Sequence, residues 1–228
     1  MNYTVLILTH IDKKTKKVLL PHIKWLLKSN PNIDYKIIIG EDSIHGQIYN
    51  WKNSDQVLRN WWKENSHSVK NEYIAVIEWD TLVACKLPEI PEEYDLVGAM
   101  KFDENPDLRG KWKSKLMRDP SWQEENWMWW PDIPKLNLKD NQRAIGLVSF
   151  GAMFMRKKVL DDICNECCDS IYREDILSEL RFPTLASLFG NKVGKIDLPF
   201  VSWTDVKVGK KIGIYHSVDE GVALDYFS

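Results

Sequence analysis

The sequence holds one short segment whose residue types and spacing suit chemistry with a metal ion. Glu78 and Asp80 follow the apolar run 74–77 and are separated by Trp79. In an extended chain, side chains two residues apart point to the same side, so both carboxylates would lie together where a buried strand ends. Mg²⁺ and Mn²⁺ prefer oxygen ligands and are commonly shared between carboxylates and substrate phosphates. The pair could therefore hold a divalent ion that clamps a diphosphate and neutralises its charge as it leaves; alternatively, the two carboxylates only cap a turn or form salt bridges.

The elements that must position these carboxylates alternate between strand and helix. Short apolar runs predict four buried strands, at Tyr3–Thr9, 35–43, 72–80 and 94–101. Apolar residues at helical spacing predict helices between them, at 13–30 and 54–65. Pro21 either kinks the first helix or marks its true start. Asn53 or Ser54 is the expected N-cap of the second helix.

This alternation is typical of an α/β fold. We expect one domain over residues 1–228, with a mostly parallel central sheet and helices on both faces. In such sheets, ligands bind at the carboxyl ends of the strands. Three of the predicted strands end in polar or acidic residues, which are Thr9 and His10, Glu41 and Asp42, and Glu78 and Asp80. The sequence therefore predicts a binding site at that edge.

The chain changes character over residues 102–140, which are polar, rich in Pro and Trp, and without clear periodicity. A loop this long in a compact domain is usually functional or disordered. Flat aromatic rings suit the C–H faces of sugars, so the candidates for stacking on an acceptor sugar are Trp122, Trp127, Trp129 and Trp130. Any of them could instead pack beneath the loop. The basic residues of this segment could close over a diphosphate or simply be solvated; they are Arg109, Lys111, Lys113, Lys115 and Arg118.

Further regular elements are expected after this segment. A strand is predicted at 144–155, helices at 157–172 and at about 174–189, and a β-rich stretch through 213–218.

Composition excludes several classes of protein. The net charge of −2 predicts neither a nucleic-acid nor a membrane-surface partner. No apolar run reaches the length of a transmembrane helix, and the N-terminus lacks the features of a signal peptide. The 4 Cys are too few for a disulfide framework, so a reducing, cytoplasmic location is expected. The run Cys164, Cys167 and Cys168 lacks a fourth ligand for zinc and more simply fills helix-packing positions.

The segment 74–80 resembles the acid-x-acid signature of GT-A glycosyltransferases, here as E-x-D. The resemblance implies a donor site for a nucleotide-sugar. Thr9, with His10 beside it, would begin the nucleoside pocket, and Asp42 would contact the base or ribose. Gly151 and Ala152 resemble the small-residue turn beside the donor sugar.

Residues 174–181 resemble the E-D-x-x-x-x-x-R helix start of inverting, family-two-like enzymes. Asp175 would then be the general base, with Glu174 and Glu179 as alternatives for that role. His216 resembles the late His that completes the metal shell, so the implied ligands of Mn²⁺ or Mg²⁺ are Asp80, Glu78 and His216. The chain departs from the family at Glu78, where Asp is usual, and at Leu177, where inverting enzymes often carry an acid.

The resemblance implies a metal-dependent glycosyltransferase that moves a sugar from a nucleotide-diphosphate donor, with UDP-sugars favoured, to a glycan or other hydroxyl acceptor, with inversion. Residues 1–101 would bind the nucleotide-sugar, and residues 102–228 would carry the acceptor site, with Trp127, Trp129 and Trp130, and the catalytic base. Two alternatives stay open, a retaining glycosyltransferase and a catalytically silent carbohydrate-binding domain, the latter favoured by the 11 Trp residues. A nucleotidyltransferase is disfavoured, because residues 10–17 contain no Gly to cradle a triphosphate.

Overall fold

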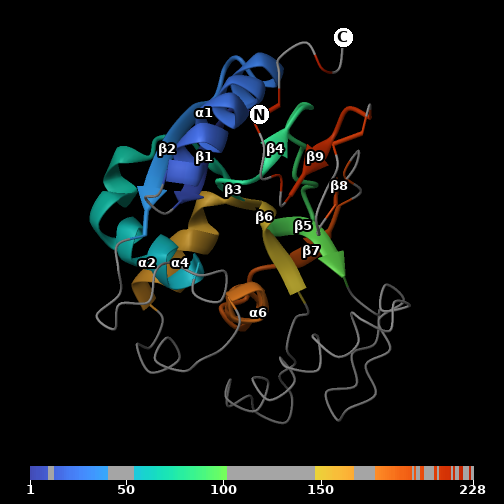
Figure 1. The fold of residues 1–228 in the computed structure, drawn as a ribbon. Helices are drawn as coiled ribbons and strands as arrows, with labels where there is room; N and C mark the ends of the chain where they lie inside the picture. Colours follow the sequence, from blue (N-terminus) through green and yellow to red (C-terminus); the bar gives the residue numbers. More distant parts are fainter. Residues whose placement is uncertain are drawn as a thin grey trace, which may run out of the picture.

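The computed structural model describes residues 1–9, 13–40, 54–101, 147–166, 178–196, 198, 201–202, 208–209, 211–216, 218, 221–222 and 226. Their centre is a six-stranded sheet of order β2-β1-β3-β6-β5-β7 (Figure 1). Its strands are β1 (Tyr3–Thr9), β2 (Asp34–Ile39), β3 (Tyr73–Glu78), β5 (Leu96–Lys101), β6 (Leu147–Arg156) and β7 (Val193–Lys195).

The sheet is mostly parallel, as predicted. β1 pairs in parallel with β2 and with β3, and β5 pairs in parallel with β7. β6 alone runs antiparallel to its two neighbours, β3 and β5. The carboxyl ends of β1, β2 and β3 therefore meet at one edge of the sheet, where the sequence predicted a binding site.

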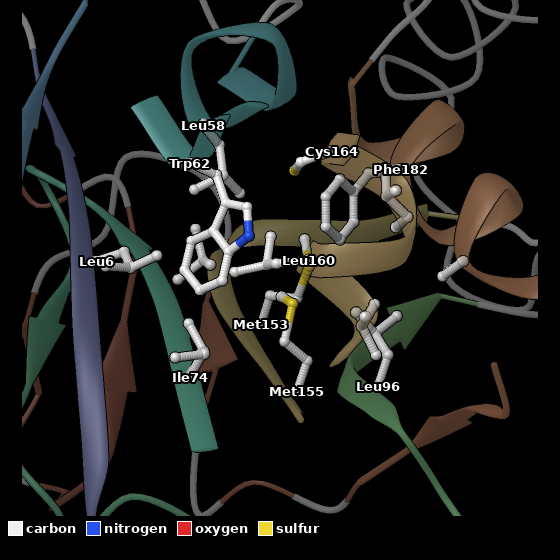
Figure 2. Packing of buried hydrophobic residues seen from close by; sticks show 14 of the residues in the cluster. Leu6, Leu58, Trp62, Ile74, Leu96, Met153, Met155, Leu160, Cys164 and Phe182 are labelled. Carbon is white, nitrogen blue, oxygen red and sulfur yellow. The ribbon is translucent and has the colours of Figure 1, made fainter. Parts of the chain in front are cut away.

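The central strands are apolar throughout because both faces of the sheet are covered. Alternate side chains of β1, such as Leu6 and Ile7, enter different core clusters. One cluster joins the sheet to α2 (Ser54–Asn65), α4 (Lys157–Glu166) and α6 (Ser178–Leu188). Figure 2 shows Trp62 of α2 and Phe182 of α6 within it. Burying a side chain such as Phe182 contributes about 1.5–3 kcal/mol to the free energy of unfolding, relative to leaving it exposed.

The other face is covered by α1 (Lys13–Ser29), whose Ile23 and Leu26 pack in the second cluster. Helices thus cover both faces, as predicted. α1 runs through Pro21 from Lys13, so Pro21 does not mark the start of this helix. The predicted helix over 54–65 is confirmed in full as α2. No helix among the described residues combines the length and the hydropathy needed to span a bilayer.

A small second sheet lies next to the carboxyl end of β3. It has the order β4-β9-β8, formed by β4 (Leu82–Val83), β9 (Ile214–Tyr215) and β8 (Val201–Ser202). β4 pairs antiparallel with β9. Because β4 begins two residues after Asp80, this pairing carries the late part of the chain back to the end of β3.

Candidate metal centre

Glu78, Asp80 and His216 form one cluster at the carboxyl end of β3. Each offers a ligand atom, and these atoms all lie within 4.8 Å of one another. The Nε2 atom of His216 lies 2.9 Å from Oε2 of Glu78 and 3.6 Å from Oδ1 of Asp80. Two carboxylates and an imidazole form an oxygen and nitrogen donor set that suits Mn²⁺ or Mg²⁺. The residues present therefore fit the ion that the resemblance implies.

Backbone hydrogen bonds fix the turn that carries the two carboxylates. The amide of Trp79 donates to the carbonyl of Leu8, which continues the β1–β3 ladder one residue past its end. The amide of Thr81 donates to the carbonyl of Glu78 and closes the turn. The amide of Val218 donates to the carbonyl of Asp80, which ties the turn to the segment that bears His216.

The buried side chain of His22, on α1, also contacts this turn. Its Nδ1 atom lies 3.2 Å from the carbonyl oxygen of Trp79, the residue between the two carboxylates. No ligand role was predicted for His22. The structure gives it a place behind the turn, where it fixes the peptide that joins Glu78 to Asp80.

The first two residues of α2 link the centre to a distant helix. Ser54, which was expected to be a helix cap, donates a 3.0 Å hydrogen bond from Oγ to Oε1 of Glu78. Asp55 accepts two hydrogen bonds from Arg181 of α6, at 2.6 and 2.5 Å, and both side chains are fully buried. The role of Asp55 could not be predicted from local spacing, because its partner lies 126 residues away in the sequence.

The protonation of His216 depends on the carboxylates around it. Burial alone would lower its pKa, but the hydrogen bond and charge of Glu78, with the charges of Asp80 and Glu179, raise the pKa to about 9. At pH 7 the metal-free imidazole is therefore a cation held against two carboxylates. A bound divalent ion would replace that proton as the positive charge of the cluster.

Three other predicted donor residues lie in strands. Thr9 is buried at the end of β1, one residue beyond Leu8, which pairs with Glu78. Gly151 and Ala152 lie within β6, inside the range 144–155 that the sequence predicted as a strand, and the register of β6 with β5 shifts at this point, between Val148 and Met153. Ala152 packs in the core, and Gly151 faces the imidazole of His216.

Glu179, an alternative for the base, lies in the first turn of α6. The other predicted site residues lie outside the described part of the chain. They are His10, Asp42, Glu174, Asp175, Trp122, Trp127, Trp129 and Trp130, together with the basic residues of 109–118.

Comparisons with known proteins show the fold. No family model matches the sequence, and no curated protein matches it. The galactosyltransferase LgtC, solved with donor and acceptor sugar analogs, superposes with a TM-score of 0.50 at 12% identity, over 93% of this chain and 86% of its own. The glycosyltransferase GlyE of Streptococcus pneumoniae TIGR4 gives a TM-score of 0.46 at 11% identity, over 85% of this chain and 45% of its own. A Drosophila β-1,4-galactosyltransferase 7 mutant, solved with manganese, UDP-Gal and xylobiose, gives a TM-score of 0.41 at 11% identity, over 95% of this chain and 71% of its own.

The superposition on LgtC shows that the chain has the GT-A-like fold found in nucleotide-sugar glycosyltransferases, as the sequence predicted. At an identity of 12%, the similarity extends to the fold alone.

Proposed function

We propose that this chain binds a nucleotide-sugar through a divalent ion and transfers the sugar to a hydroxyl acceptor. The observation that carries the proposal is the cluster of Glu78, Asp80 and His216 at the carboxyl edge of a GT-A-like sheet. These residues lie 138 positions apart at the extremes, and the fold brings them to the edge at which α/β sheets bind ligands.

The proposed chemistry divides between the ion and the protein. Glu78, Asp80 and His216 would hold the ion, which supplies positive charge beside the departing nucleoside diphosphate. The protein must also remove the proton of the acceptor hydroxyl, and we assign this to Asp175. The acceptor oxygen forms a bond to the anomeric carbon as the bond from that carbon to the diphosphate breaks. The proton passes to the carboxylate, and the electron pair leaves with the diphosphate.

The proposed division of the chain follows the same logic. Residues 1–101 supply the donor half, with Thr9, His10 and Asp42 toward the nucleotide. Residues 102–228 supply the acceptor half, with Trp127, Trp129 and Trp130 as stacking candidates. A UDP-sugar with Mn²⁺ is the first donor to test.

Binding of nucleotide-sugars tests the proposal directly. UDP-, GDP- and dTDP-sugars are titrated by calorimetry, each with and without Mn²⁺, and hydrolysis of the donor is followed in parallel. We expect one nucleotide class to bind only when Mn²⁺ is present and to be slowly hydrolysed. Binding of glycans without any metal-dependent nucleotide-sugar binding would favour the alternative, a carbohydrate-binding domain, for which the 11 Trp residues are the supporting observation.

The stereochemical course is tested once a donor is known. Inversion with Asp175 as the base predicts that NMR finds the opposite anomeric configuration in the product, and that Asp175→Asn binds the donor but transfers no sugar. Retention, or full activity of the variant, would contradict this assignment and leave the metal-dependent donor site in place.

A further inference from the structure

Gly151 lies against the imidazole ring of His216. A Cβ atom built on Gly151 would lie 2.5 Å from Cγ of that ring, 2.6 Å from Cδ2 and 2.9 Å from Nδ1. Cβ atoms in real structures essentially never approach other heavy atoms within 3.0 Å. No side chain other than hydrogen therefore fits at position 151 while His216 keeps its place.

The φ angle of Gly151 does not require a glycine. Gly151 lies in the part of β6, between Val148 and Met153, where the register with β5 shifts, but among the described residues the positive-φ glycine is Gly190. The space taken by the His216 ring is thus the feature that requires glycine there.

The ring is held from two sides. Its Cγ, Cδ2 and Nδ1 atoms face β6 at Gly151, and its Nε2 atom faces Glu78 and Asp80. Cγ is the ring atom closest to the backbone of His216. A small tilt of the far end of the ring would therefore not move Cγ away from the methyl group of an alanine at position 151. The side chain would have to rotate about its first torsion angle, which would carry Nε2 away from both carboxylates.

We propose that Gly151 is a positioning residue of the metal centre, whose missing side chain lets the His216 imidazole reach Glu78 and Asp80. This role replaces the contact with the donor sugar that the sequence predicted for Gly151. It rests on the proposed function only in that the cluster binds a divalent ion. The placement of His216 beside Gly151 does not depend on any sugar.

Four variants test the role: Gly151→Ala, His216→Ala, the double variant, and Gly194→Ala as a matched control. Gly194 is a glycine of β7 in the same sheet, and a Cβ there would meet the ring of Tyr94, which belongs to no metal ligand set. The affinity for Mn²⁺ alone is measured by electron paramagnetic resonance or calorimetry. We expect Gly151→Ala and His216→Ala each to weaken Mn²⁺ binding at least tenfold, the double variant to match His216→Ala, and Gly194→Ala to keep the wild-type affinity.

A metal-free measurement separates this inference from the proposed function. In crystals of the protein prepared with EDTA, we expect Nε2 of His216 to leave hydrogen-bonding distance of Glu78 in Gly151→Ala and to stay there in Gly194→Ala. If the wild type binds neither Mn²⁺ nor Mg²⁺, the proposed function fails, and this structural comparison still decides the role of Gly151. An unmoved His216 would overturn the inference.

Two further outcomes bear on it. Should Gly151→Ala fold poorly, the double variant must recover the melting temperature of His216→Ala, because the ring that clashes is gone; failure to recover would overturn the inference. A raised KM for the donor with an unchanged Mn²⁺ affinity would also overturn it and restore the donor-sugar contact.

Discussion

At the scale of single residues, the site depends on the charges and hydrogen bonds of Glu78, Asp80 and His216. Glu78 accepts hydrogen bonds from Ser54 and from His216 through different oxygen atoms. Asp80 lies on the other side of Trp79, in a turn held by three backbone hydrogen bonds. The backbone and neighbouring side chains therefore hold the two carboxylates close to each other.

Asp80→Asn is expected to weaken Mn²⁺ binding by about 100-fold or more, because a neutral amide replaces a charged ligand. The melting temperature of the metal-free protein should change little, since the backbone bonds of the turn remain. Calorimetric titration with MnCl₂ measures the effect. Asp34→Asn, an exposed carboxylate on β2 far from the centre, is the control and should bind Mn²⁺ normally. Equal affinity of Asp80→Asn and wild type would remove Asp80 from the ligand set.

The pH dependence of stability follows from the raised pKa of His216. A histidine with a pKa of about 9 in the folded chain and an ordinary 6.5 in the unfolded chain stabilises the fold fully below pH 6.5. That contribution is lost as the pH rises from 6.5 through 9. In EDTA, the melting temperature should fall over this range, and it should fall less in His216→Gln. The difference between the two proteins isolates His216 from groups such as the Cys85 thiol, whose pKa burial raises to about 11. Parallel curves would contradict the ion pair with Glu78.

At the scale of elements, α2 connects Glu78 to α6. Its first residue bonds to Glu78, and its second is paired with Arg181 of α6. Asp175, the proposed base, precedes α6 by only a few positions in the sequence. Arg181, the last residue of the motif that resembles the inverting enzymes, thus anchors α6 to α2 in the core.

Asp55→Ala should lower the free energy of unfolding by about 3–5 kcal/mol, because it leaves the fully buried guanidinium of Arg181 without its carboxylate. Urea denaturation measures this loss. Replacing both residues, as in Asp55→Leu with Arg181→Met, should recover much of the stability, since no buried charge remains. If Asp55→Ala is as stable as the wild type, the buried pair does not hold α2 and α6 together.

At the scale of the whole molecule, the candidate metal centre brings together residues that lie far apart in the sequence. Glu78 lies at the end of a central strand, whereas His216 follows β9 in the second sheet. An ion bound by both would hold the two sheets together in the folded state and would have no such site in the unfolded chain.

Mn²⁺ should therefore raise the melting temperature by mass action. At about 100 times its Kd, the ion should stabilise the fold by about 2.7 kcal/mol, which corresponds to roughly 5–10 °C for a chain of this size. Differential scanning calorimetry in EDTA and in MnCl₂ measures the shift. Asp80→Asn should show almost none of it, and an equal shift in that variant would mean that the ion binds elsewhere.

The sequence by itself determined the main strands and helices and the acidic pair of the candidate site, Glu78 and Asp80. Buried strands and amphipathic helices could be predicted from the spacing of apolar residues, because each pattern reflects a local backbone period. The pair Glu78 and Asp80 could be recognised because both residues lie close together in the sequence, directly after one apolar strand. His216 was expected only by resemblance, since no local pattern joins it to that strand.

Tertiary structure decided everything that depends on contacts between distant segments. Pairing of β4 with β9 brings His216 to Asp80, and packing of α2 against α6 pairs Asp55 with Arg181. It also places Gly151, within the predicted strand, against the ring of His216. The physical reason is the same in each case. The spacing of apolar residues along the chain indicates which side of a strand or helix a residue occupies, and only the packed fold determines which residues that side contacts.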